Sequence, residues 1–190
     1  MRGSPFRAIL AALLFSLLAA CATQPSTSDV EKIDRVLTLI QQRLAIADDV
    51  ARNKWNSGAA IEDLPREREI IEGLSRQAAG YGLTADLAGD FFRAQIEASK
   101  IIQHARFRGW RAAGQPKFSQ VRDLGKDIRP ALDALTPQMM RALADAAPAL
   151  QAPESQRLIA QRANAIVANH GDETARDTAI APLLRIAGRR

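Results

Sequence analysis

The feature that most constrains this 190-residue chain is the spacing of apolar residues between positions 30 and 47. They recur every three or four residues and so share one face of an α-helix, which turns once in about 3.6 residues. These residues are Val30, Ile33, Leu37, Ile40, Leu44 and Ala47. Ser28 followed by Glu31 is typical of a capping box at a helix start. We therefore predict a long helix from about Asp29 to Trp55, ended by a Ser-Gly pair.

Similar patterns predict helices along the rest of the chain. Pro65 suits the first turn of a second helix, with Asp63 or Leu64 near its cap, running to about residue 79. After a Gly-Tyr-Gly break, Thr84 caps a third helix that runs to about Ala112. Further helical segments are predicted near 118–134, 137–147, 154–169 and 173–187.

Prolines are the main breaks expected in the second half of the chain. Pro130 should kink or restart the helix that contains it. Thr136 followed by Pro137 is a strong signal for a cap and a new first turn, so we expect a helix boundary there. No segment has a convincing strand pattern, and Val, Thr and Tyr are scarce. The predicted fold class is therefore all-α, a helical bundle.

The first 21 residues have the pattern of a signal peptide. Arg2 and Arg7 provide the positive start, and an apolar run of 13 residues follows at 8–20, too short to span a bilayer comfortably. The cleavage site has two interpretations. The segment ending at Cys21 resembles a lipobox, in which this Cys is lipidated and anchors the protein to the membrane. An ordinary A-x-A site also fits there. Export to the periplasm is expected in both cases.

Charge and cysteine content exclude several classes of protein. Loss of the two signal-peptide arginines lowers the net charge from +5 to +3, which is too little for a typical nucleic-acid binder. The single Cys leaves no disulfide within the mature chain. His104 and His170 lack metal-ligand spacing, and no nucleotide-binding or nucleophile motif occurs. Neither a metal nor a cofactor is expected, so an enzyme here would work by binding and electrostatics.

Three groups of polar residues are candidates for a site. Arg43 and Lys54 are eleven residues apart, which places them on one helix face about 16 Å apart along the axis. The simpler interpretation is that both side chains reach out to water. The charged run at 63–69 fits a solvated helix start equally well. Ser99 and Gln103 point the same way on the third helix, as a buried polar pair or as an ordinary amphipathic boundary.

Taken together, these residues resemble the all-helical chorismate mutases of the secreted class. The resemblance lies in their order and spacing and in three phrases, QQRLAIADDVARNKW, IEDLPRERE and FFRAQIEASKIIQHARF. It implies rearrangement of chorismate to prephenate, in Phe and Tyr biosynthesis, with no cofactor. By resemblance, Lys54 and Gln103 are the catalytic donors. The residues implied to bind substrate are Arg43, Asp63, Arg66, Glu67, Ser99 and Arg129.

The resemblance also implies how the chain is divided into a core and an extension. Residues 29–112 match the mutase core, and residues 113–190 form a helical extension that completes the site. In that extension the phrase IRPALDALTPQMM supplies Arg129 from the same chain. Pro130 directly after it departs from the family pattern, as does the lipobox at Cys21. A homodimer is also implied. The alternative is a non-enzymatic helical lipoprotein of the cell envelope that binds a partner or a small anionic ligand.

Overall fold

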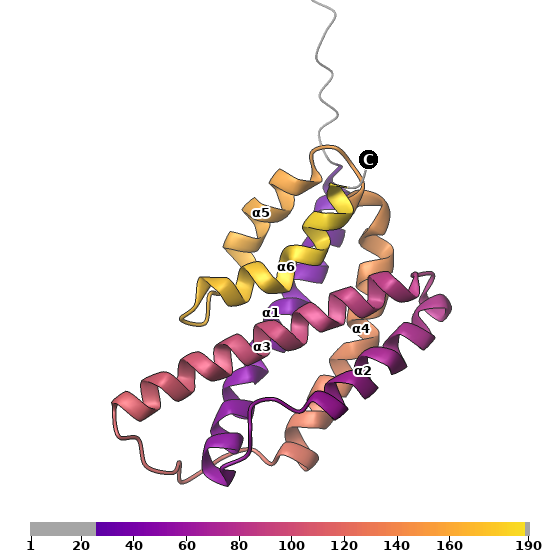
Figure 1. The fold of residues 1–190 in the computed structure, drawn as a ribbon. Coiled ribbons are helices and arrows are strands. Elements are labelled where there is room, and N and C mark those ends of the chain that lie inside the picture. The colour runs from indigo at the N-terminus through magenta and orange to yellow at the C-terminus, as the bar shows by residue number, and fades with distance from the viewer. Residues whose placement is uncertain (1–25, 189–190) are drawn as a thin grey trace, which may run out of the picture.

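The structure is a computed structural model that describes residues 26–188. Its described residues form six α-helices and no β-strand, which confirms the all-α prediction (Figure 1). The predicted signal peptide and Cys21 lie outside the described residues. The helices are α1 (Thr27–Ser57), α2 (Leu64–Gln77), α3 (Ala85–Ala112), α4 (Arg129–Leu150), α5 (Ser155–Ile166) and α6 (Glu173–Ala187), with a 3₁₀ turn η2 (Ala78–Tyr81) and a π-helical turn η3 (Leu124–Ile128).

Helix α1 forms as its periodicity predicts, but it extends two residues further at each end than predicted and has a different N-cap. The N-cap is Ser26, whose hydroxyl oxygen accepts a hydrogen bond from the backbone N–H of Asp29 at 3.1 Å. The predicted capping box of Ser28 and Glu31 therefore lies inside the first turn. Two serines stand near the start, and the local pattern alone does not select between them. Gly58 ends the helix with φ of 73°, a left-handed conformation that favours glycine.

The predicted caps of α2 and α3 are confirmed. Asp63 is the N-cap of α2, and its carboxylate accepts from the backbone N–H of Arg66 at 3.3 Å. Thr84 caps α3 by accepting from the backbone N–H of Leu87 at 3.2 Å. Between the two helices, Gly82 adopts φ of 75° and lets the chain reverse. α3 therefore returns along the bundle beside α1 and α2.

The predicted helix boundary at Pro137 is wrong, and α4 runs through it from Arg129 to Leu150. Residues 118–123, predicted helical, are not in a helix. Pro137 has no N–H to donate, so its place inside α4 costs one backbone hydrogen bond. Burial of Met139, Met140 and Leu143, each no more than 1% exposed, offsets that cost. Pro130 lies in the first turn of α4, where a missing N–H is tolerated, and the helix restarts there as predicted.

One hydrophobic core joins the helices on both sides of position 113. α1 packs against α3, α4 and α5, and α6 packs against α3, so that α1 is covered along much of its length (Figure 1). Leu37, Ile40 and Leu44 of α1 are fully buried, together with Phe91 of α3 and Leu183 of α6. No helix in the described part of the chain is long and apolar enough to cross a membrane.

A second, smaller cluster closes the end of the bundle near the α1 C-terminus. Trp55 and Phe107 meet edge to face with ring centroids 5.2 Å apart, and Trp110 lies 5.5 Å from Trp55. The two tryptophans are therefore packing residues. They hold the ends of α1 and α3 together next to the cavity described below.

Candidate active site

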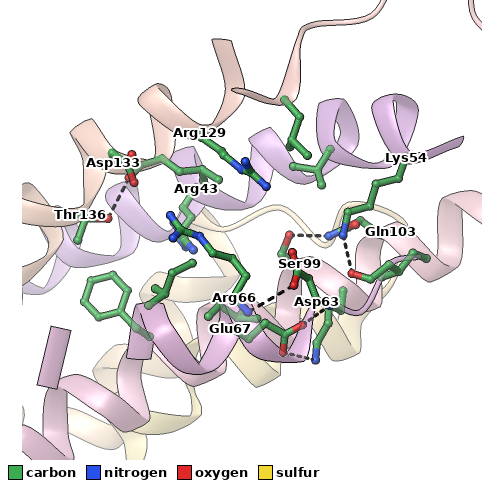
Figure 2. A pocket seen from close by; sticks show the side chains of 18 of the residues that line it. Arg43, Lys54, Asp63, Arg66, Glu67, Ser99, Gln103, Arg129, Asp133 and Thr136 are labelled. Atoms are coloured by element: carbon green, nitrogen blue, oxygen red, sulfur yellow. Dashed lines mark hydrogen bonds and ion pairs between the residues drawn. The ribbon is translucent and has the colours of Figure 1, made fainter. Parts of the chain in front are cut away.

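A cavity of about 170 Å³ lies between α1, α2, α3 and the η3–α4 segment (Figure 2). All eight side chains predicted to bind or transform a substrate line it, although they come from four separate helices. Arg129, the residue expected from the C-terminal half, is among them.

Arg43 and Lys54 lie on the same face of α1, as their spacing of three helical turns predicts. Arg43 is only 8% exposed, and its Nε has no hydrogen-bond partner in the described structure. Burial lowers the pKa of Arg43 to about 10, against a smaller opposing effect of the Asp133 carboxylate. A buried guanidinium that faces a cavity with an unused donor is suited to an anionic ligand.

Lys54 is half-buried at the other end of the cavity. Its Nζ donates a hydrogen bond to the backbone carbonyl of Ile61 at 2.5 Å, in the loop between α1 and α2. Burial lowers the pKa of Lys54, and the carboxylates of Asp63 and Glu67 oppose that shift. The ammonium therefore has a fixed position with further donors free for a ligand.

The start of α2 places two more charged residues at the cavity. The backbone N–H of Asp63 donates to Glu67 Oε1 at 3.1 Å, while the Asp63 side chain caps the helix, so the two residues fix each other. Arg66 lines the cavity but is partly exposed, and its Nη1 pairs with Glu69 at 2.7 Å. Exposed ion pairs of this kind are weak, so the Arg66 guanidinium can leave Glu69 and bind an anion in the cavity.

Ser99 and Gln103 form the polar wall on α3, one helical turn apart. Gln103 Nε2 donates to Ser99 Oγ at 3.1 Å, and Gln103 is only 3% exposed (Figure 2). Its Oε1 is buried without a partner in the described structure. Of the two sequence interpretations, the structure therefore supports the buried polar pair.

Arg129 reaches the cavity from the first turn of α4 (Figure 2). Its side chain is exposed, and no ion pair or hydrogen bond within residues 26–188 occupies it. The π-helical turn η3, capped by Asp123, delivers α4 to this place. Pro130 does not displace Arg129 from the cavity, because a proline in the first turn leaves the helix geometry intact.

Several further residues line the cavity that were not predicted from the sequence. Lys100 follows Ser99 on α3, and its Nζ lies 3.0 Å from Glu67 Oε2 and 2.7 Å from Glu97 Oε1. Its spacing from Glu97 suggests only a surface pair. Asp133 and Thr136 of α4 also line the cavity, and Thr136 was predicted only as the cap of a new helix. The apolar wall is formed by Val50, Ile61, Ile70, Leu74, Phe92, Ile96, Leu124 and Leu132.

The two histidines do not take part in the cavity. The His104 ring lies 2.7 Å from Glu62 at the surface, and His170 lies 3.3 Å from Gln41 elsewhere in the fold. Among the described residues, no group of three or more His, Cys, Asp or Glu side chains is arranged to hold a metal ion. The cavity presents five cationic and three carboxylate side chains, one amide and two hydroxyls, and its excess of cations suits it to bind and orient an anion.

Comparisons with known proteins agree with the family resemblance described above. The sequence profile described as chorismate mutase type II matches residues 28–104. A secreted chorismate mutase of Mycolicibacterium smegmatis is 31% identical over 146 residues, covering 76% of this chain and 80% of the relative. The chain belongs to the chorismate mutase family.

Solved chorismate mutases share the fold as well. The crystal structure of the enzyme from Burkholderia thailandensis matches with a TM-score of 0.74 and 32% identity, covering 80% of this chain and 98% of that one. The enzyme from Burkholderia phymatum matches with a TM-score of 0.76 and 30% identity, covering 82% and 98%. Shares of this size exceed what residues 1–112 could supply, so the likeness to chorismate mutases extends into the C-terminal half. These relatives give no support to the alternative of a non-enzymatic envelope protein.

Proposed function

We propose that this chain catalyses the rearrangement of chorismate to prephenate in the cavity between α1, α2, α3 and α4. The observation that carries the proposal is the buried Arg43 guanidinium, which has an unused donor and faces the cavity. Leaving such a group unpaired is costly, and a substrate carboxylate satisfies it. The reaction is an isomerisation, and the family resemblance supports assignment to the isomerases.

The charge of the cavity suits this substrate. Five cationic and three carboxylate side chains line it, so two positive charges are in excess. Chorismate carries two carboxylates, and a cavity with this balance attracts a dianion. We assign the carboxylates to Arg43, Arg66 and Arg129, because a guanidinium binds a carboxylate through two parallel hydrogen bonds and stays charged. Ser99 adds a hydroxyl donor to a carboxylate or orients its neighbour Gln103.

The arginines act by orientation. The reaction is a one-step pericyclic rearrangement, and it proceeds when the enolpyruvyl arm lies over the ring. Cations placed on three helices hold the two carboxylates at a set separation, which selects that conformer from the many that chorismate adopts in water. The apolar wall around Phe92 and Ile96 excludes water and so strengthens each of these contacts.

Lys54 and Gln103 act on the charge that develops during the reaction. As the C–O bond of the ether lengthens, negative charge grows on its oxygen. A donor aimed at that oxygen binds the transition state more strongly than the substrate. We assign the Lys54 ammonium and the Gln103 amide N–H to this oxygen. Glu67 accepts from the ring hydroxyl, next to the backbone of Asp63.

The test is turnover by the purified mature protein. Chorismate is added, and the loss of its absorbance is followed at several concentrations. We expect saturable conversion to prephenate without added metal or cofactor. The matched control is the variant Arg43→Met, which keeps an unbranched, flexible side chain and removes its charge. Absence of conversion by folded wild-type protein contradicts the proposal.

The location and assembly of the protein are separate proposals. The M. smegmatis relative is described as secreted, which supports export of this chain. We further propose that Cys21 is lipidated and tethers the enzyme to the periplasmic side of a membrane, a finer claim that rests on the lipobox pattern. A homodimer, expected from the family, is tested by the mass of the purified protein in solution.

A further inference from the structure

Lys100 and Glu67 form the most buried ion pair among the described residues. Their side chains are 12% and 16% exposed, whereas those of the cross-helix pair Arg106–Asp48 are 38% and 29% exposed. Both residues line the cavity, Lys100 from α3 and Glu67 from the first turn of α2. The pair therefore crosses the wall of the proposed active site and does not lie on the outer surface.

The pair leaves the Glu67 carboxylate no freedom to rotate. Oε2 accepts from Lys100 Nζ at 3.0 Å, and Oε1 accepts from the backbone N–H of Asp63 at 3.1 Å. One contact comes from α3 and the other from the α2 cap, so the carboxylate is held from two directions. A carboxylate oxygen has two acceptor positions, and each retains one for a further donor. Glu67 is therefore placed in advance to receive a hydroxyl group.

Lys100 also sets the charge of this wall. Burial alone would favour its neutral form, but its hydrogen bonds to Glu97 and Glu67 outweigh burial and raise the pKa of Lys100. It therefore remains charged and offsets a carboxylate that faces an anionic substrate. Without Lys100, the excess of positive charge along the cavity falls from two to one.

We propose that Lys100 is a positioning residue, which acts through Glu67 to orient the substrate ring by its hydroxyl group. This inference rests on the proposed function, because it assigns a partner to the residue that receives that hydroxyl. Lys100 has no contact of its own with the reacting atoms in this scheme. Its effect should therefore disappear when Glu67 can no longer act as a carboxylate.

The experiment is a double-mutant cycle on kcat/KM for chorismate, with the melting temperature of each protein measured in parallel. Lys100→Met should lower kcat/KM by about tenfold, the low end of the loss seen when a group that orients a site residue is removed. Lys100→Arg should restore most of that loss, because it keeps a cationic donor. In the Glu67→Gln background, Lys100→Met should cause less than about a twofold further loss, since coupled residues are not additive.

Glu97→Gln is the matched control, because it removes the other carboxylate partner of Lys100 and leaves the pair with Glu67. It should leave kcat/KM within about twofold of wild type. An equal loss from Lys100→Met with and without Glu67→Gln would overturn the inference. If Lys100→Met does not fold, Lys100→Gln keeps a polar donor and takes its place in the same cycle. Failure of the wild type to convert chorismate contradicts the proposed function, whereas normal turnover by a folded Lys100→Met protein contradicts only this inference.

Discussion

Replacing Arg43 with Met should make the protein more stable and much less active. Arg43 is buried, its Nε has no partner within the described residues, and burial lowers its pKa from the ordinary value of an arginine to about 10. A shift of that size corresponds to a cost of about 3 kcal/mol for folding with the charged side chain. Met keeps an unbranched apolar side chain in the same space without that cost. The pKa of about 10 already includes the attraction of Asp133, and the smaller Met side chain loses some packing, so we expect a net gain of about 1–2 kcal/mol.

The sign of the pH dependence follows from the lowered pKa of Arg43. Below pH 10 the side chain is charged in both the folded and the unfolded protein, so the whole cost is present. Above that pH the folded protein loses the proton first, and the cost falls as pH rises toward the unfolded value. The stability difference between wild type and Arg43→Met should therefore be constant across the neutral range.

Calorimetry and steady-state kinetics measure the two effects. A gain of 1 kcal/mol raises the melting temperature of a chain of this size by about 2–4 °C. Loss of one charge-assisted contact to a carboxylate costs about 3 kcal/mol of transition-state binding, which is about 100-fold in kcat/KM. Much of that loss should appear as a higher KM, because the carboxylate is present in the substrate as well as in the transition state.

Arg129→Met is the matched control. Arg129 also lines the cavity, but its side chain is exposed and bears no such burial cost. This variant should lose activity with a melting temperature close to that of wild type. A lower melting temperature for Arg43→Met would refute the argument from burial. An unchanged KM in that variant would refute its assignment to a substrate carboxylate.

Four further predictions concern Lys54, Gln103 and Cys21. Lys54→Ala should lower kcat by about 10²–10³-fold, the usual effect of losing a donor to a developing oxyanion, and near-normal turnover would remove Lys54 from this role. Wild-type kcat/KM should be nearly flat from about pH 5 to 8, because the Lys54 ammonium and the arginines stay charged there. Since burial lowers the pKa of Lys54, kcat/KM should fall at a lower alkaline pH than it would with a fully solvated lysine. Gln103→Glu should be active at acidic pH and lose activity as pH rises, since an ionised carboxylate repels the ether oxygen, and a pH profile identical to wild type would show that Gln103 does not contact it. Cys21→Ser should shift the protein from the membrane fraction to the soluble fraction or block its processing, whereas mass spectrometry showing an unmodified wild-type chain would contradict lipidation.

Most of the fold could be predicted because helical periodicity is a local property. The apolar spacing of α1 and the caps Asp63 and Thr84 can be recognised from a few consecutive residues. The break at Pro137 was predicted by the same local logic and is wrong. The cost of one missing hydrogen bond is local, but the burial that offsets it comes from packing of α4 against α1.

In the site too, some features follow from local sequence and others from tertiary packing. The spacing of Arg43 and Lys54 and the pairing of Ser99 with Gln103 each lie within one helix, so the sequence alone determined which side chains share a face. Whether those cations were solvated or enclosed depended on α2 and α4, which cover them from other parts of the chain. The contact between Lys100 and Glu67 spans 33 positions and joins two helices. Only the tertiary structure decided it, because the energy of an ion pair depends on distance and burial in space and leaves no regular pattern along the chain.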